Sequence, residues 1–186
     1  MLVSLLVTVL PVLFVGGLVR RDLAFRRRHV DMGGVPPISN ALFASSKYAI
    51  VLVWVAMVVQ SWSDRLSFID VPGAVRSASL VLWALGFALL FAGRSGLGDS
   101  FRIGSPRERT GLKRTGLYRI SRNPMYVGVY ATLGAAVLQT LNPIVLLVAV
   151  YVIAVHHRIV LAEEAQLGHA FGDEYRTYCS RVRRYL

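Results

Sequence analysis

The chain alternates long apolar stretches with short polar connections. A helix that crosses a bilayer needs roughly 20 residues, because each residue adds about 1.5 Å to its length. Three stretches approach this length, and two shorter ones follow, separated only by the sequence "LNP". The pattern predicts about five membrane helices, at residues 2–19, 41–62, 77–93, 125–140 and 144–155.

The last two stretches are typical of a tight helical hairpin that turns at residues 141–143. The fifth helix is expected to continue into water past His156 and His157, where charged residues replace the apolar run. The predicted fold is an all-α polytopic membrane protein with amphipathic, cytosolic helices at its C-terminus.

Composition supports a membrane protein. Of the 186 residues, 55% are hydrophobic and only 17% are charged, which is more apolar than the soluble average. The formal net charge of +11 would suggest nucleic-acid binding in a soluble chain. Here the positive-inside rule accounts for it, so no nucleic-acid partner is expected.

The basic residues predict the orientation. Most of them fall in the connections after the first and third stretches and in the tail, whereas Arg65 and Arg76 lie in the connection between the second and third stretches. The N-terminus is therefore expected outside and the tail in the cytoplasm. The first stretch has no basic residue before it, so we expect it to be retained rather than cleaved. The expected location is the cytoplasmic membrane of a prokaryote.

Polar chemistry concentrates in the second half of the chain. We divide the sequence into residues 1–93, with three membrane helices and their loops, and residues 94–186, with a long loop, the hairpin and the tail. The tail end "SRVRRYL" is interpreted as a basic segment bound to the membrane surface.

The stretch "YRISRNPMYVGVY" (residues 118–130) places polar residues directly against an apolar helix. Pro124 suits the first helical position, since its missing N–H would be unpaired there, and Asn123 is then the N-cap. A capped helix start with interfacial arginines and Tyr126 in the aromatic belt explains this stretch alone.

A second polar cluster contains Glu163 and Glu164 on the helix that leaves the membrane. Neither carboxylate has a basic residue three or four positions away, the spacing that ion pairs on a helix need. A carboxylate near hydrocarbon without a partner is costly, so tertiary groups or a ligand are expected to pair with it. The hairpin returns this helix to the side of Arg122, which predicts a polar pocket there.

Two motifs resemble those of the integral membrane methyltransferases that include isoprenylcysteine carboxyl methyltransferase and the phospholipid N-methyltransferases. They are "GLYRISRNPMYVG" and "RIVLAEEAQLGHAFGDEYRTYCSRV", and the segment "GRSGLGDSF" resembles a weaker upstream stretch. The resemblance covers about residues 94–182. It implies S-adenosylmethionine as cofactor, bound at the cytosolic face, and a lipophilic acceptor that enters from the bilayer.

The resemblance also implies roles for individual residues. Glu163 or Glu164 would take the cofactor's cation, and Asn123 with the following helix start would take its carboxylate. Tyr118 and Tyr126 would pack on the adenine or the sulfonium. The expected catalytic residues are Arg122, Asn123, Arg158 and Glu164, and the expected cofactor-binding residues are Gly116, Tyr118, Arg122, Asn123, Pro124, Tyr126, Gly128, Glu163 and Glu164.

The acceptor stays open among a carboxylate, a thiol and an amine. The isoprenylcysteine branch has His where this chain has Asn123, and an Asn side chain does not titrate. No metal is expected, because adjacent His156 and His157 point about 100° apart on a helix. The alternative to an enzyme is a non-catalytic membrane scaffold or lipid-binding protein of the same fold.

Overall fold

The computed structural model describes residues 1–27, 36–98 and 111–186. Its helices are α1 (Leu2–Arg26), α2 (Asn40–Ser63), α3 (Gly73–Leu97), α4 (Pro124–Thr140) and α5 (Pro143–Arg181), with a short 3₁₀ helix, η2 (Gly116–Arg119). The predicted all-α fold and the hairpin between the last two helices are confirmed. Part of the segment "GRSGLGDSF", His29 and the arginines at 28, 102, 107 and 109 lie outside the described residues.

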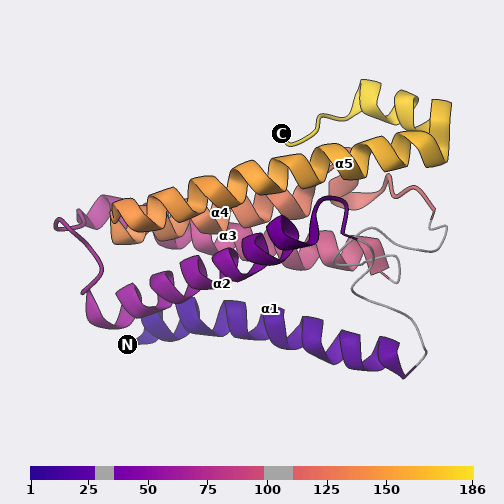
Figure 1. Cartoon of the computed structure of the whole chain (residues 1–186). Helices are drawn as coiled ribbons and strands as arrows, with labels where there is room; N and C mark the ends of the chain where they lie inside the picture. The colour runs from indigo at the N-terminus through magenta and orange to yellow at the C-terminus, as the bar shows by residue number, and fades with distance from the viewer. Residues whose placement is uncertain (28–35, 99–110) are drawn as a thin grey trace.

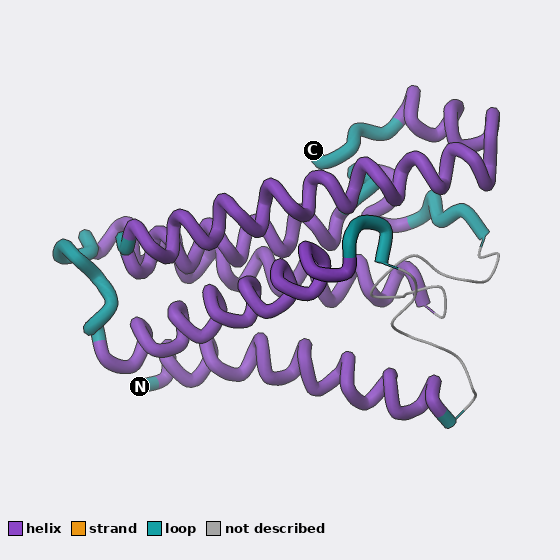
Figure 2. Tube along the Cα trace, in the orientation of Figure 1, coloured by secondary structure: helices purple, strands orange, loops and turns teal. Residues whose placement is uncertain are grey.

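The five long helices run alternately up and down in one bundle (Figures 1 and 2). The connection between α2 and α3 and the turn between α4 and α5 lie at the same end as the N-terminus. The opposite end carries the C-terminus of α1, the start of α4 and the C-terminal half of α5. The polar segments singled out in the sequence therefore meet at one end of the bundle.

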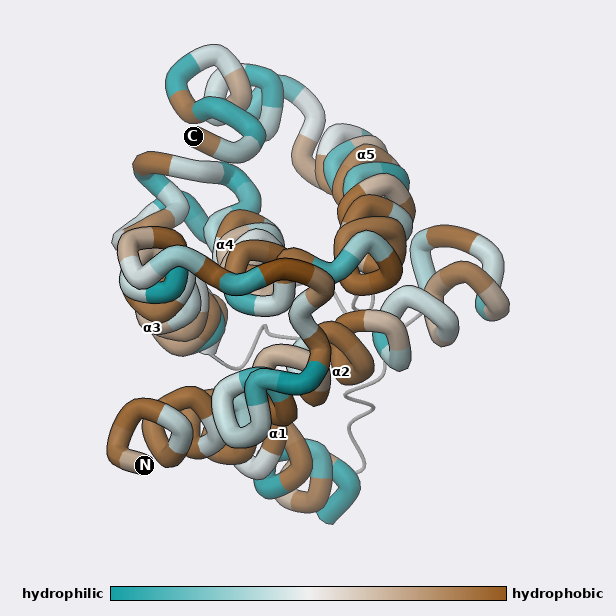
Figure 3. The backbone as a smooth tube through the Cα atoms, turned by 90° about the vertical axis from the view of Figure 1, so that its left-hand side faces the viewer, coloured by the Kyte–Doolittle hydropathy of each residue, from teal (hydrophilic) through white to brown (hydrophobic). Residues whose placement is uncertain are grey.

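Four helices, α1, α2, α3 and α5, are long and apolar enough to cross a membrane. Helix α4 has only 17 residues and is about 26 Å long. It packs against α2, α3 and α5, so its surface is largely covered by other helices. Large apolar side chains are exposed on the outside of the bundle, as hydrocarbon requires, including Val12, Leu52 and Leu147. Figure 3 shows these apolar helices from the end of the bundle.

Helices α3 and α4 approach each other closely at a pair of glycines. A Cβ atom added to Gly128 would lie 2.8 Å from the carbonyl oxygen of Gly86, and one added to Gly86 would lie 2.9 Å from that of Gly128. Small residues at such a crossing let the backbones pack directly, which is how membrane helices gain contact energy. Beside them, Trp83, Phe87 and Leu133 are fully buried in the core.

Helix α5 bends sharply at Gly172, whose φ of 51° and ψ of −121° are not helical. The chain then reverses, and its last helical turns lie over the polar end of the bundle (Figure 1). Tyr175, Tyr178 and Val182 are buried there in a small apolar cluster. These side chains pack the returning chain onto the protein, while Arg181 and Arg183 of the tail stay exposed.

Candidate functional site

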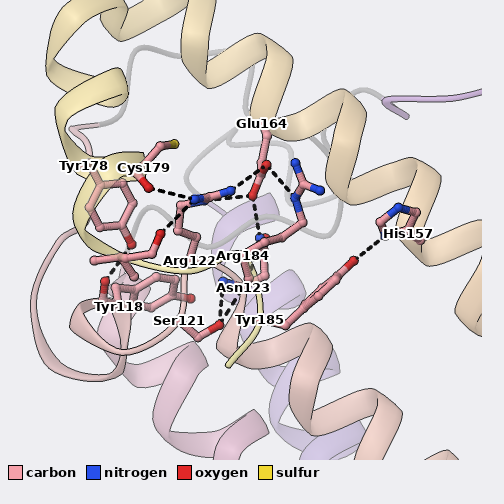
Figure 4. Close-up of polar contacts among 11 residues, drawn as sticks. Tyr118, Ser121, Arg122, Asn123, His157, Glu164, Tyr178, Cys179, Arg184 and Tyr185 are labelled. Carbon is pink, nitrogen blue, oxygen red and sulfur yellow. Dashed lines mark hydrogen bonds and ion pairs between the residues drawn. The ribbon is translucent and has the colours of Figure 1, made fainter.

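A network of polar contacts joins the start of α4, the middle of α5 and the returning tail (Figure 4). Each part is near the point where its helix leaves the apolar layer. A span of roughly 20 residues from Pro143 would end at about Ala162, where the apolar run also ends, so both glutamates lie just beyond it. The network therefore lies at the edge of the membrane.

Glu164 is the centre of this network. Arg122 grips its carboxylate with two hydrogen bonds, from Nε at 3.0 Å and from Nη2 at 3.2 Å. Asn123 Nδ2 donates to it at 3.0 Å and Arg184 Nε at 2.9 Å. Burial alone would raise the pKa of Glu164, but the hydrogen bonds and charges of the two arginines hold that pKa below its usual value. Glu164 is thus ionised and fully paired.

Arg122 also ties the tail to the loop before α4. Its Nη1 donates to the carbonyl oxygens of Val182, at 2.8 Å, and Cys179, at 3.3 Å. Its side chain is only 11% exposed, as is that of Glu164, so little solvent competes for these bonds. The predicted tertiary partner is present for Glu164, and in this structure the Arg122 guanidinium bonds to Glu164 and to the tail.

The final residues of the chain complete the network. The backbone N–H of Arg122 donates to the carbonyl of Arg183 at 2.9 Å, and Ser121 and Asn123 donate side-chain hydrogen bonds to the carbonyl of Arg184. His157 Nδ1 lies 2.8 Å from the hydroxyl of Tyr185. The sequence interpretation missed Ser121, Arg184 and Tyr185. Two features of the sequence could have indicated that the tail takes part: the acidic residues in α5 without local partners, and the arginine-rich tail itself.

Glu163 lies in a different environment from its neighbour. Among the described residues its carboxylate accepts one hydrogen bond, from the Tyr126 hydroxyl at 3.1 Å, and it pairs with no cation. Burial raises the pKa of Glu163 to about 7, the charge of Glu164 adds to the rise, and the bond from Tyr126 opposes it. The two adjacent carboxylates therefore have different roles. Glu164 holds the loop before α4 and the tail in place, whereas the Glu163 carboxylate is able to pair with a cation.

Tyr118 makes no hydrogen bond to either carboxylate among the described residues. The residue is 7% exposed, its hydroxyl donates to the Gly93 carbonyl at 3.3 Å, and its own carbonyl accepts a bond from the Tyr178 hydroxyl at 2.6 Å. A Cβ atom added to Gly96 of α3 would lie 3.4 Å from the Tyr118 ring. The stacking role expected for Tyr118 has no support here, because both ring and hydroxyl are used in packing η2 against α3.

Other expected site residues have local structural tasks. Gly116 has a φ of 61° at the start of η2, a left-handed conformation that glycine adopts freely. Pro124 is the first residue of α4 and Gly128 is packed on α3. Asn123 is at the N-cap position, but its side chain makes no capping bond because it binds Glu164. Arg158 is exposed and makes no hydrogen bond or ion pair with the described part of the chain.

Fold and site together define an all-helical integral membrane protein with a polar centre where its last helices leave the apolar layer. The sequence model of the family described as phospholipid methyltransferase matches residues 75–174, more than half of the chain. The chain belongs to this family of membrane methyltransferases, and the matched region includes η2, α4 and most of α3 and α5. A search of curated proteins found no match.

Proposed function

We propose that the protein is an S-adenosylmethionine-dependent methyltransferase that acts on a lipophilic acceptor at the membrane face. The observation that carries the proposal is Glu163, a partly buried carboxylate at the membrane edge without a cationic partner among the described residues. Family membership supports methyl transfer, and the exposed apolar bundle supports an acceptor that arrives through the lipid.

The donor set near Glu163 fits this cofactor. S-adenosylmethionine carries an ammonium and a sulfonium group, which pair with carboxylates, and a carboxylate, which pairs with N–H donors. Glu163 would hold the cation. The N–H groups of Met125 and Tyr126, in the first turn of α4, have no acceptor among the described residues and would receive the carboxylate.

When bound, the cofactor supplies an activated methyl group. The chain's own residues bind and orient: Glu163 fixes the cation, and Tyr126 holds the Glu163 carboxylate through its hydroxyl. The network around Glu164 keeps the loop before α4 and the tail in place. Positioning two reactants in this way supplies a large part of the rate of a displacement reaction. Acceptors with oxygen, sulfur or nitrogen nucleophiles are all compatible with these roles, including the carboxyl O-methylation of the isoprenylcysteine branch.

The distribution of basic residues supports an active site on the cytoplasmic side. Arg94, Arg122 and the tail arginines lie at the end of the bundle that carries the site, whereas Arg65 and Arg76 lie at the other end. By the positive-inside rule the site end faces the cytoplasm and the N-terminus lies outside.

Cofactor binding is expected to depend on pH through Glu163. Below its pKa of about 7 the carboxyl is neutral, and above it the ionised form attracts a cation. Affinity for S-adenosylhomocysteine, which retains the ammonium group, should rise about tenfold from pH 6 to pH 8, in proportion to the ionised fraction. Calorimetric titrations of the detergent-purified protein at both pH values measure this. An affinity that falls or stays constant over this range would contradict the assignment of Glu163.

A further inference from the structure

The last five residues of the chain, 182–186, follow α5 and cross from the start of α4 to the middle of α5 (Figure 4). This C-terminal segment is not helical, and a β-bridge joins its Arg183 to Ser121. The segment lies beyond residues 75–174, which the family model matches. It is therefore a feature of this chain that family membership does not explain.

The first part of the C-terminal segment is held firmly. The carbonyl oxygen of Arg183 accepts a hydrogen bond from the backbone N–H of Arg122 at 2.9 Å. Arg184 Nε donates to the Glu164 carboxylate at 2.9 Å, and the Arg184 carbonyl accepts a bond from Asn123 Nδ2 at 3.2 Å. Hydrogen bonds between ionised groups are roughly twice as strong as neutral ones. Arg184 is therefore the fixed point of the segment.

The last two residues are held by weaker contacts. The Tyr185 hydroxyl lies 2.8 Å from His157 Nδ1, in a pair at the surface of the bundle. Leu186 is 71% exposed. Because the bond of Tyr185 joins uncharged groups, it is weaker than the ion pair of Arg184 with Glu164. Tyr185 and Leu186 can therefore turn away from α5 while Arg184 stays bound.

Tyr185 bridges the two helices of the hairpin. Its ring lies against Tyr130 of α4, with centroids 5.6 Å apart, and against His157 of α5, with centroids 6.0 Å apart. Tyr130 is seven residues after Asn123, and His157 is seven residues before Glu164. Seven residues are about 10 Å of helix, so the C-terminal segment runs along the α4–α5 junction from the Arg184 contacts toward the membrane interior.

The proposed cofactor residue lies at the same junction. The Tyr126 hydroxyl is 3.1 Å from Glu163, and Tyr126 precedes Tyr130 by four residues, so both rings lie on one face of α4. The Tyr185 hydroxyl is near enough to Tyr126 for the two groups to interact electrostatically. Tyr185 thus closes the α4–α5 junction beside Glu163.

We propose that Tyr185 and Leu186 are a gate over the ligand site at Glu163, hinged at Arg184. In the closed state Tyr185 bridges α4 and α5, as in this structure. In the open state the two residues turn away from the bundle, and the ligand enters or leaves through the junction. The inference rests on the proposed methyltransferase function, because the ligand whose passage is controlled is the cofactor or its product, S-adenosylhomocysteine.

Both states provide Tyr185 with suitable surroundings. His157 is five residues before Ala162, so Tyr185 lies about 8 Å from the membrane edge. Tyrosine is favoured in this interfacial layer, where its ring meets lipid and its hydroxyl meets water, and the side chain of Leu186 is apolar. Opening therefore exchanges one favourable environment for another, while the contacts of Arg184 stay unchanged.

A gate differs from a ligand contact in its kinetics. Opening is needed both for entry and for release, so removal of the gate raises both rate constants by the same factor and leaves the affinity unchanged. Loss of a residue that holds the ligand raises only the dissociation rate constant, and the affinity falls. Measuring both rate constants therefore separates the two roles of Tyr185.

The test compares Tyr185→Ala with Tyr48→Ala, the same change at a tyrosine of α2 that is 72% exposed. Surface plasmon resonance of each detergent-purified variant gives the rate constants for S-adenosylhomocysteine. In Tyr185→Ala both should rise about tenfold, the change that loss of one ordinary neutral hydrogen bond produces in an equilibrium, while Kd changes less than about twofold. Tyr48→Ala should match the wild type. Unchanged rates in Tyr185→Ala would overturn the gate, as would faster dissociation without faster association.

A second experiment holds the gate closed. His157→Cys and Tyr185→Cys are combined with Cys179→Ser, which removes the single native cysteine, and the two new thiols are joined by a short bismaleimide. Linked after saturation with S-adenosylhomocysteine, the protein should release it at least about tenfold more slowly than the same variant treated with N-ethylmaleimide, because the open state is lost. Equal release rates in the two samples would contradict the gate.

The gate and the methyltransferase proposal fail in different ways. A wild-type protein that does not bind S-adenosylhomocysteine contradicts the methyltransferase proposal itself. A wild-type protein that binds it, with rates that neither Tyr185→Ala nor the cross-link changes, contradicts the gate alone.

Discussion

Glu163→Gln is expected to weaken S-adenosylhomocysteine binding about 100-fold while leaving the protein folded. Gln keeps the length of the side chain and an oxygen that can accept the bond from Tyr126, but it removes the charge that would pair with the ligand's ammonium. A charge-assisted hydrogen bond in a partly buried site is worth about 2–3 kcal/mol, which corresponds to this loss of affinity. Calorimetry in detergent gives the affinity, and thermal unfolding checks the fold.

Glu174→Gln is the matched control for that change. Glu174 lies on the returning part of α5, where its half-exposed side chain pairs with Arg114 at 2.8 Å. A solvent-exposed pair of this kind contributes little, so the control should bind like the wild type. Glu164→Gln should instead lower the unfolding temperature, because it leaves Arg122 and Arg184 without their counter-charge. Equal affinity in Glu163→Gln and the wild type would remove Glu163 from the cofactor site.

Gly128→Ala is expected to destabilise the bundle by about 1–3 kcal/mol, the range for overpacked cores. The new Cβ atom would lie 2.8 Å from the Gly86 carbonyl oxygen and 3.1 Å from side-chain atoms of Leu89 and Leu90. The Gly86 carbonyl is a backbone group that cannot rotate away as a side chain could, so α3 and α4 must separate for the methyl group to fit. Thermal unfolding in detergent should show a lower midpoint temperature than the wild type.

Gly16→Ala makes the same chemical change in α1, where a Cβ atom would meet nothing within 4 Å. Alanine loses less backbone entropy than glycine on entering a helix, so this variant should be as stable as the wild type or gain up to about 1 kcal/mol. Equal unfolding temperatures for the two variants would show that the α3–α4 approach is not limited by Gly128.

The apolar stretches predicted the helices well, because a chain in lipid has few ways to satisfy its backbone other than helix formation. The structure extends α2 and α4 by a single residue at an end, α1 and α3 by about one or two turns, and α5 much further, to Arg181. Polar residues at the helix ends continue the same hydrogen-bond pattern outside the apolar layer. Hydropathy alone therefore does not predict how far a helix continues outside the apolar layer.

The reversal of α5 was not predictable from local signals. Gly172 in "AFGDEY" is one glycine in a helical pattern, which by itself indicates only reduced helix propensity. What fixes the turn is tertiary: Tyr175 and Tyr178 are buried after it, and the tail binds Arg122 and Glu164. Contacts between residues far apart in sequence have no signature in a window of a few positions.

The pairing of the two glutamates was predictable in kind but not in detail. Their lack of local cations indicated tertiary partners, and Arg122 is one of them. Adjacent residues on a helix point about 100° apart, so only one of Glu163 and Glu164 is able to face Arg122. Which one does so depends on the rotation of α5 about its axis, and packing against α2 and α4 sets that rotation.

The most direct test of the account is calorimetric titration of S-adenosylhomocysteine into the detergent-purified wild-type protein at pH 8, beside the Glu163→Gln, Glu164→Gln double variant. The account predicts micromolar binding by the wild type and none by the double variant. A well-folded wild-type protein that shows no binding would contradict it and would favour a non-catalytic membrane scaffold or lipid-binding protein of the same fold.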